Sequence, residues 1–275
     1  MAKSHKLRQA EVQAFQAQIW AFYRHSGRHN LPWRKTKNPY KILISEVMLQ
    51  QTQVARVLEK YPEFLEKFST VEALAVAPLS DVLRVWQGMG YNRRALALKR
   101  MAEKIVNEYK GKIPRERLSL ESLPGVGHYT AGAVRAFAFN EPEIFIETNI
   151  RRIFIHHFFG NKEGISDQEI LPLVEATLYM KNPSEWYWAL MDYGSHLPKI
   201  TKTNSNIQSK HYTKQRIFKG SLRELRGKIV RSLNEKPKTE AALARWCNDT
   251  RIGEALSTLT KDGLIKYEKR TYQLA

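Results

Sequence analysis

At 275 residues the chain is long enough to bury the core of one large or two modest domains. Its 45 Lys and Arg residues against 27 Asp and Glu residues give a formal net charge of +18, which favours a polyanionic partner and salt-sensitive binding. The single cysteine, Cys247, excludes an internal disulfide and any multi-cysteine metal site. The sequence has no 18-residue apolar run and no secretory signal, so we expect a cytoplasmic protein with no membrane partner.

Apolar residues at helical spacing predict an all-α region over roughly the first 200 residues. A first helix is predicted at 9–25, and after the extended segment Leu31–Arg34 a second runs from about Tyr40 to Lys60. Further helices are predicted at 71–87, 92–110, 116–122, 128–139, 148–158, 167–180 and 183–194. No alternating apolar run long enough for a sheet precedes residue 200.

The stretch 199–222 carries many Lys and Arg residues and no Asp or Glu, and we interpret it as a basic linker. It is either a solvated loop or an extended segment whose basic side chains bind DNA phosphates. Three helices are then predicted at Leu225–Asn234, Thr239–Asn248 and Ile252–Lys261, followed by a β-hairpin turning at Glu268–Arg270. This C-terminal part, 223–275, resembles a winged-helix domain, which would either place its third helix in a DNA groove or dock another protein.

The segment Leu123–Thr130 predicts a tight glycine turn between two short helices. Gly125 and Gly127 lack a Cβ, so backbone N–H groups of the turn can face outward. The helix that begins after Gly127 adds the positive end of its dipole, which favours one DNA phosphate. The alternative is an ordinary glycine-containing turn.

Five patterns stand in a fixed order: Leu31–Arg34, Ser45–Thr52, Trp86–Tyr91, Leu123–Gly127 and Glu147–Arg152. Together the runs SEVMLQQTQV, LPGVG-x-YTAGA and TNIRR resemble the helix-hairpin-helix DNA glycosylases, and within them the MutY-type adenine glycosylases. The resemblance covers about residues 9–197 and implies an all-α glycosylase domain of two helical subdomains at 1–198. It implies a monomeric, nucleoid-associated base excision repair enzyme whose partner is double-stranded DNA with a mismatch or lesion. Such an enzyme flips out one base, most readily adenine, and hydrolyses its N-glycosidic bond.

That reaction needs an acid to protonate the departing base and a carboxylate to oppose the positive charge on the sugar. Glu46 lies between the apolar triplets Ile42–Ile44 and Val47–Leu49, where desolvation favours a neutral carboxyl. By resemblance Glu46 is the general acid. The alternative is an ordinary glutamate on a helix surface.

Glu147 stands where the family carries an aspartate, and by resemblance it would stabilise the oxocarbenium ion or attack it. Glutamate is one methylene longer than aspartate, and three outcomes are open. The chemistry is retained with a shifted geometry, the rate is reduced, or the protein binds DNA without cleaving the bond. We favour retained chemistry. Tyr129 and Asn149 match positions that orient this carboxylate and the sugar, although either could cap a helix or pack. The lyase branch carries a lysine in place of Tyr129, and tyrosine cannot form a Schiff base, so we expect a monofunctional enzyme.

The resemblance also assigns a base pocket and a DNA-contacting set. The pocket residues are Trp33, Arg34, Leu49 and Trp188. The DNA-contacting residues are a minor-groove probe of Gln50, Gln51 and Thr52, an intercalating wedge of Met89 and Tyr91, and Gly125, Gly127 and Thr130 of the turn. The wedge residues could instead pack in the core. Trp188 replaces a Glu or Gln of the adenine enzymes, so if it lines the pocket the excised base could be thymine or uracil opposite guanine.

Two further departures from the family limit what is expected. Its four iron–sulfur ligands are replaced, near the expected spacing, by Pro198, Ser205, Gln208 and Lys214, so we expect no 4Fe–4S cluster and no other cofactor. The resemblance leaves open a structural Na⁺ or K⁺ at turn carbonyls near Leu123 and Val126. The C-terminal part shows no nucleotide-hydrolase-like domain, so we expect no strong 8-oxoguanine preference.

The alternative to an enzyme is a non-catalytic, lesion-binding protein. In that interpretation Glu147 in place of aspartate has abolished the catalytic activity of the site.

Overall fold

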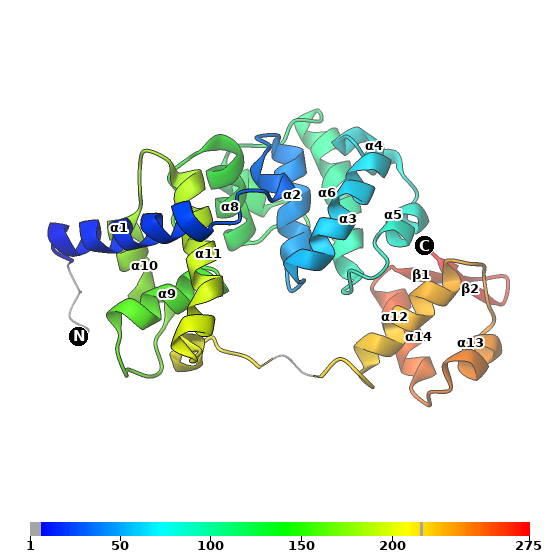
Figure 1. Ribbon diagram of the computed structural model, residues 1–275. Coiled ribbons are helices and arrows are strands. Elements are labelled where there is room, and N and C mark those ends of the chain that lie inside the picture. Colours follow the sequence, from blue (N-terminus) through cyan, green and yellow to red (C-terminus); the bar gives the residue numbers. More distant parts are fainter. Residues whose placement is uncertain (1–6, 215–216) are drawn as a thin grey trace. The chain divides into compact units, whose positions relative to one another are not determined.

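The computed structural model describes residues 7–214 and 217–275, which form fourteen α-helices, two short 3₁₀ helices and one two-stranded sheet (Figure 1). These residues divide into two compact units. Of the described residues, unit 1 comprises 7–42 and 127–214, and unit 2 comprises 43–126 and 217–275. Within the described ranges, every helix is too short or too polar to cross a membrane.

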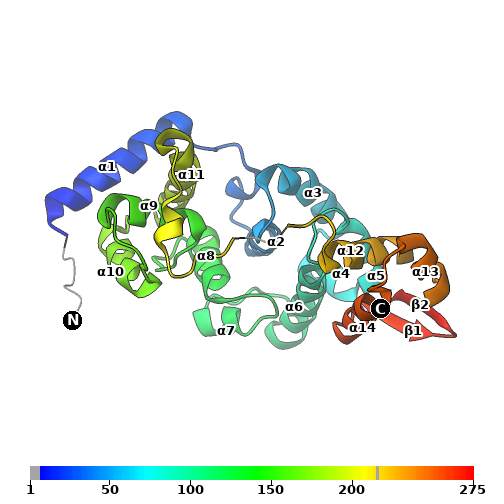
Figure 2. The same ribbon diagram turned by 90° about the horizontal axis from the view of Figure 1, so that it is seen from below.

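Unit 1 is built around its longest helix, α11 (Pro183–Thr201), which packs against α1, α8 and α9 (Figure 2). Pro183 starts this helix, and the Asn182 side chain caps it by accepting from the backbone N–H of Glu185 at 3.3 Å. The core is aromatic: Tyr187 stacks on Phe145 with ring centroids 3.9 Å apart. The other elements of unit 1 are α1 (Gln9–Ser26), η1 (Pro32–Arg34), α8 (His128–Phe139), α9 (Thr148–Phe158), α10 (Asp167–Thr177) and η2 (Ser205–Gln208).

Unit 2 combines a helical part with the C-terminal part. The helical part contains most of α2 (Pro39–Leu49), then α3 (Val54–Lys67), α4 (Val71–Val76), α5 (Leu79–Val85), α6 (Arg93–Tyr109) and α7 (Arg117–Glu121). The C-terminal part contains α12 (Leu222–Leu233), α13 (Glu240–Cys247), α14 (Ile252–Lys261), β1 (Ile265–Glu268) and β2 (Thr271–Leu274). The helical part packs around α6, and β1 pairs antiparallel with β2. The predicted all-α fold with a small C-terminal α+β part is confirmed.

Two predicted helices are wrong because each is divided in two. The helix predicted from Tyr40 to Lys60 is interrupted between α2 and α3, where Gln51 adopts φ +53°, a left-handed conformation that an α-helix cannot contain. The helix predicted at 71–87 is interrupted between α4 and α5. There Pro78 lacks an N–H donor and holds Ala77 in an extended conformation.

Part of the predicted basic linker is ordered and packed in unit 1. Helix α11 continues to Thr201 instead of ending at Gly194, and Ser205 and Asn206 of η2 are buried. The Gln208 side chain donates to the carbonyls of Gly160 at 2.7 Å and Lys162 at 2.8 Å. Hydrogen bonds therefore hold the segment that contains Ser205 and Gln208 against the rest of unit 1. Arg216 of the same stretch lies outside the described residues.

Candidate active site

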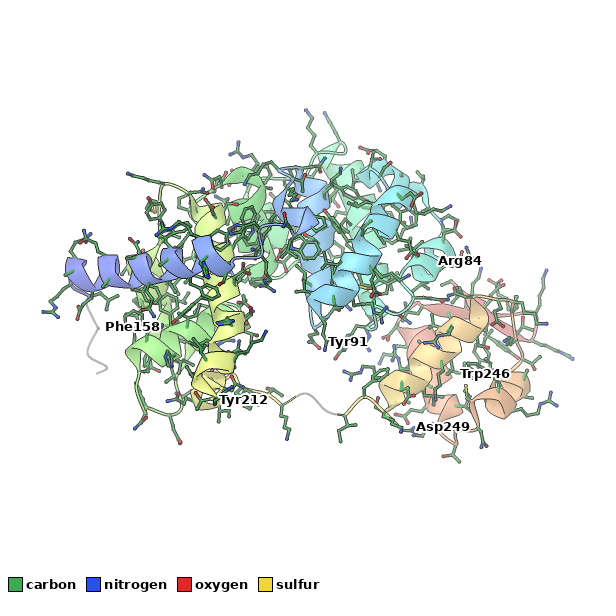
Figure 3. All side chains as sticks on the ribbon, in the orientation of Figure 1. Arg84, Tyr91, Phe158, Tyr212, Trp246 and Asp249 are labelled. Atoms are coloured by element: carbon green, nitrogen blue, oxygen red, sulfur yellow. The ribbon has the colours of Figure 1, made fainter. Side chains whose placement is uncertain are left out.

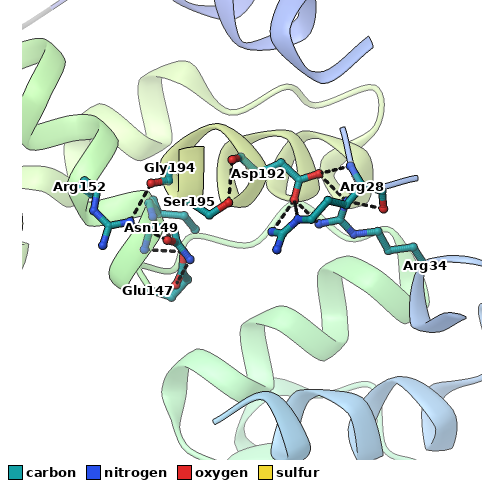
Figure 4. Close-up of polar contacts among 9 residues, drawn as sticks. Arg28, Arg34, Glu147, Asn149, Arg152, Asp192, Gly194 and Ser195 are labelled. Carbon is teal, nitrogen blue, oxygen red and sulfur yellow. Dashed lines mark hydrogen bonds and ion pairs between the residues drawn. The ribbon is translucent and has the colours of Figure 1, made fainter. Parts of the chain in front are cut away.

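Glu147 is the N-cap of α9, and both of its carboxylate oxygens are held there (Figure 4). Its Oε1 accepts from the backbone N–H groups of Asn149 at 2.7 Å and Ile150 at 2.9 Å, and its Oε2 accepts from the Asn149 amide at 3.2 Å. The charge thus lies at the positive end of the helix dipole. This capping holds the carboxylate at the first turn of α9.

A second set of contacts fixes the residues around Glu147. Arg152 donates through Nη1 to Oδ1 of Asn149 at 2.8 Å and to the carbonyl of Gly194 at 2.7 Å (Figure 4). Helices α9 and α11 approach so closely here that a Cβ on Gly194 would lie 2.4 Å from the carbonyl oxygen of Asn149. Asn149 is therefore held by the packing of two helices, as a group that orients a carboxylate must be.

Removal from water raises the pKa of the Glu147 carboxyl above its ordinary value. The hydrogen bonds from Asn149 and Ile150 and the charge of Arg152 act in the opposite direction but do not cancel this effect. The carboxylate consequently loses its charge at a higher pH than an exposed glutamate does.

If base release needs ionised Glu147, its rate falls as the pH drops through this raised pKa, because a neutral carboxyl cannot oppose the charge on the sugar. Arg152→Gln removes a cation that lowers the pKa of Glu147, so we expect the acid limb of the profile to move to higher pH. Single-turnover rates between about pH 4 and pH 8 measure this shift. An acid limb that stays in place in the variant would assign it to another group.

Glu46 lies in α2 with only 4% of its surface exposed. The residues on either side of it, including Ile44 and Val47, are buried, so the predicted desolvated environment is confirmed. The alternative of a surface glutamate is wrong. Glu46 belongs to unit 2 and Glu147 to unit 1, and the convergence of the two carboxyl groups stays a prediction.

Arg34 forms an ion pair with Asp192 that the sequence did not predict. Its Nη1 and Nη2 donate to Asp192 of α11 at 2.7 and 2.8 Å, and Arg28 donates to the same carboxylate through its backbone N at 2.7 Å and its Nε at 2.6 Å (Figure 4). Burial alone would raise the pKa of Asp192, but the bonds and charges of Arg34 and Arg28 hold it below the ordinary value. These contacts of Asp192 with Arg28 and Arg34 fix η1 to α11, and with η1 the buried ring of Trp33.

Trp188 is half-buried on α11 and is surrounded by cations. Its ring stacks on Phe137 with centroids 5.7 Å apart, and the charged groups of Arg34 and Lys37 lie 5.5 and 5.2 Å from its centroid. Attraction between the cations and the ring face fixes the indole in place. This environment differs from an apolar core, and the position of Trp188 in a base pocket stays a prediction.

The glycine turn places Gly125 and Gly127 in different environments. Gly125 has φ +80°, and a Cβ there would lie 2.8 Å from Cβ of Ala97. Gly127 is the extended N-cap of α8, and a Cβ there would meet nothing within 4 Å. Both glycines are exposed, but Thr130, in the first turn of α8, is only 3% exposed, which corrects the expectation that its side chain is open to DNA.

We therefore expect Gly127→Ala to fold normally but to bind DNA several-fold more weakly, because its methyl group would stand where a phosphate approaches the helix. Gly125→Ala should instead lower the melting temperature, because of its positive φ and the clash with Ala97. Thermal unfolding and DNA titration of both variants separate the two effects. Unchanged DNA affinity in Gly127→Ala would contradict a phosphate site at this turn.

The probe loop (Gln50–Thr52) and the wedge loop (Gly88–Tyr91) both lie in unit 2 and share one anchor, Arg94. Its guanidinium donates to Gln50 O at 2.7 Å, to Thr52 Oγ1 at 3.0 Å, and to Met89 O at 2.7 Å. It also donates to the carbonyls of Val47, Met48 and Gly90. Nothing in the local sequence marked this residue, because most of its partners lie in the stretch 47–52, more than 40 residues away, and the others in the wedge loop.

The predicted DNA-contacting residues differ in exposure. Gln51 is exposed, and Gln50, Thr52 and Tyr91 are partly exposed. Met89 is only 4% exposed, which corrects the expectation of a protruding side chain, since it packs in the core beneath the loop. In unit 1 Tyr129 is half-buried and lies edge-on to Phe145, with centroids 5.7 Å apart. Leu49 is half-buried at the end of α2.

Comparison with known proteins gives one matching family model, two similar relatives and one similar solved structure. Residues 44–175 match the HhH-GPD superfamily of base excision DNA repair proteins. The chain is 31% identical over 232 residues to the adenine DNA glycosylase of Buchnera aphidicola subsp. Baizongia pistaciae, covering 82% of this chain and 64% of that protein. It is 32% identical over 269 residues to the adenine DNA glycosylase of Mycolicibacterium smegmatis, covering 90% and 92%. A solved structure of a thermostable thymine-DNA glycosylase is 30% identical with a TM-score of 0.62, covering 67% and 86%. The chain thus spans less than two thirds of the first relative and most of the second.

Proposed function

Because the chain belongs to the HhH-GPD superfamily of base excision DNA repair proteins, we propose that it is a monofunctional DNA glycosylase that removes adenine from mismatched double-stranded DNA. The observation that carries this proposal is the capped, half-buried carboxylate of Glu147, which is suited to oppose a positive sugar. In the same proposal the protein works as a monomer on nucleoid DNA.

The proposed reaction breaks the bond between the sugar C1′ and the base nitrogen. Glu46 gives its proton to the departing base, and the bonding electrons leave with the base. Glu147 opposes the positive charge that develops on the sugar. Asn149 and Tyr129 orient the Glu147 carboxylate and the sugar. Water then adds to C1′ and loses a proton, which leaves an abasic site. No Schiff base forms, because a tyrosine occupies position 129.

The proposal includes no iron–sulfur cluster, because the chain has one cysteine. The carbonyl of Leu123 accepts the N–H of Val126 at 3.1 Å and keeps a second lone pair. That lone pair could bind Na⁺ or K⁺ at the turn, where the ion would add positive charge near the phosphate.

The direct test is single-turnover base release from a panel of duplexes carrying adenine opposite 8-oxoguanine, adenine opposite guanine, thymine or uracil opposite guanine, and hypoxanthine. Alkali then cleaves each abasic site. Glu46→Gln is the matched control, because it removes the proton donor at nearly constant shape. Strand scission without alkali would refute the monofunctional assignment. Tight binding without scission on every duplex would support the non-catalytic lesion-binding protein.

A second candidate is removal of thymine or uracil opposite guanine. It is favoured by Trp188, whose indole offers one N–H donor and no acceptor for an adenine edge, and by the likeness to the thymine-DNA glycosylase structure. We expect Trp188→Glu to raise adenine release relative to thymine release by about tenfold, which corresponds to one good polar contact. The ratio of the two single-turnover rates measures this. A ratio equal to that of the wild type would place Trp188 outside the pocket.

A further inference from the structure

Within unit 2, Arg223 of α12 reaches Tyr91 of the wedge loop (Figure 3 labels Tyr91). Its Nη1 donates to the Tyr91 hydroxyl, and its guanidinium carbon lies 4.8 Å from the centroid of the Tyr91 ring. The same carbon lies 5.1 Å from the ring of Phe218. A residue of the C-terminal part therefore holds both the face and the polar end of a wedge side chain.

The wedge loop needs such support because its backbone is unusual. Gly88, Gly90 and Tyr91 all have positive φ, at +84°, +69° and +47°, and this region is unfavourable for a residue with a Cβ. Arg94 holds the carbonyl of Gly90 at 3.1 Å, and Trp86 Nε1 donates to the same oxygen at 3.0 Å. These two bonds fix the backbone and leave the direction of the Tyr91 side chain to contacts with its ring. One comes from Arg94, whose guanidinium carbon lies 5.6 Å from the ring centroid, and a closer one comes from Arg223 at 4.8 Å.

Packing does not close the space between the wedge loop and α12. A cavity of about 510 Å³ is lined by Gly88, Gly90 and Tyr91 on one side and by Arg223, Gly227 and Val230 on the other. A ring released from Arg223 would have room to turn into this cavity. The hydrogen bond and cation–π contact of Arg223, together with the longer cation–π contact of Arg94, thus restrict the ring where apolar packing does not.

Helix α12 is itself anchored to the helical part of unit 2. Asp262, at the end of α14, accepts from Arg93 Nε of α6 at 2.6 Å and also from Arg226 of α12. Its side chain is largely buried, and the two arginines lower its pKa despite the burial that would raise it. One carboxylate thus ties together α6, α12 and α14, which keeps Arg223 within reach of Tyr91.

We propose that Arg223 is a positioning residue for base flipping, which sets the Tyr91 ring in the direction needed to enter the DNA stack. The C-terminal part then contributes to the flipping step itself, in addition to any DNA contact of its own. This proposal rests on the proposed function, because it takes Tyr91 as the side chain that fills the space of the extruded base.

The test compares Arg223→Gln with Arg223→Lys and with Arg231→Gln. Arg231 is the matched control, because it lies on the same helix, lines the same cavity and forms no ion pair with any described residue. Hydrogen exchange of the amides at 88–92 in the DNA-free protein reports on the loop. The fluorescence of 2-aminopurine placed beside the target base reports on flipping, and titration of undamaged duplex gives the general DNA affinity.

We expect Arg223→Gln to speed exchange at 88–92 and to lower the flipping equilibrium by about tenfold, as the loss of a cation–π contact and a charged hydrogen bond implies. Arg231→Gln should change neither exchange nor flipping. Both variants lose one positive charge, so both should lose the same amount of affinity for undamaged duplex. Arg223→Lys should recover part of the loss. Equal flipping in Arg223→Gln and Arg231→Gln would overturn the proposal, and so would faster exchange with unchanged flipping. A wild-type protein that flips no base on any duplex would instead overturn the proposed function.

Discussion

Glu147→Gln is expected to slow base release by on the order of 10³-fold while leaving DNA affinity nearly unchanged. Glutamine keeps the length of the side chain and one oxygen that can accept from Asn149 and Ile150, so the cap of α9 survives. What it loses is the negative charge that opposes the sugar cation. Abasic-site formation with enzyme in excess gives the rate, and titration of the same duplex gives the affinity.

Glu147→Asp is the informative companion, because aspartate is the residue that the resemblance in sequence implies for this position and is also a favourable N-cap. We expect its rate to lie within about tenfold of the wild type, since the capping of the longer side chain already places a carboxylate at the same helix end. If the wild type were as slow as Glu147→Gln while Glu147→Asp were fast, the extra methylene would have silenced the site. That result would support the lesion-binding interpretation.

The sequence predicts the helices that carry the candidate site because their signals are local. The expected ranges 128–139 and 148–158 agree with α8 and α9, since a glycine precedes the first and a capping acid precedes the second. The break at Gln51 could not be predicted, because the segment between α2 and α3 contains neither glycine nor proline. The carbonyl that precedes this left-handed turn, that of Gln50, accepts a hydrogen bond from Arg94, which is more than 40 residues away in the chain.

The same distinction applies to the candidate site. The apolar triplets around Glu46 predict its burial, because neighbours in a helix share its environment. The pairing of Arg34 with Asp192 joins residues 158 positions apart, and no local pattern encodes it. Met89 is buried although two glycines flank it, because their positive φ values turn the loop so that its side chain points inward. Residue types with a chemical role are thus readable from the sequence, whereas the residues that hold them in place come from tertiary contacts.

Arg94→Leu is expected to lower the free energy of unfolding by about 3–5 kcal/mol, the range for removing a charged group that satisfies several buried acceptors. Leucine keeps most of the apolar contact but leaves six oxygen acceptors without this donor, including those of Gln50, Thr52 and Met89. Burial lowers the pKa of Arg94 to about 10, so the wild-type group is charged at neutral pH and its bonds are strong. Urea unfolding gives the change in stability.

The control is Arg84→Gln, which removes an arginine from the surface of α5 (Figure 3). Among the described residues, Arg84 pairs only with Asp81, one turn away. Such an exposed pair contributes less than about 1 kcal/mol, so the control should unfold nearly as the wild type does. Because Arg94 supports the probe loop and the wedge loop together, Arg94→Leu should also weaken binding to mismatched duplex more than binding to matched duplex. Equal stability of the two variants would mean that each loop holds its own conformation. A uniform loss on both duplexes would mean that Arg94 contributes only its charge.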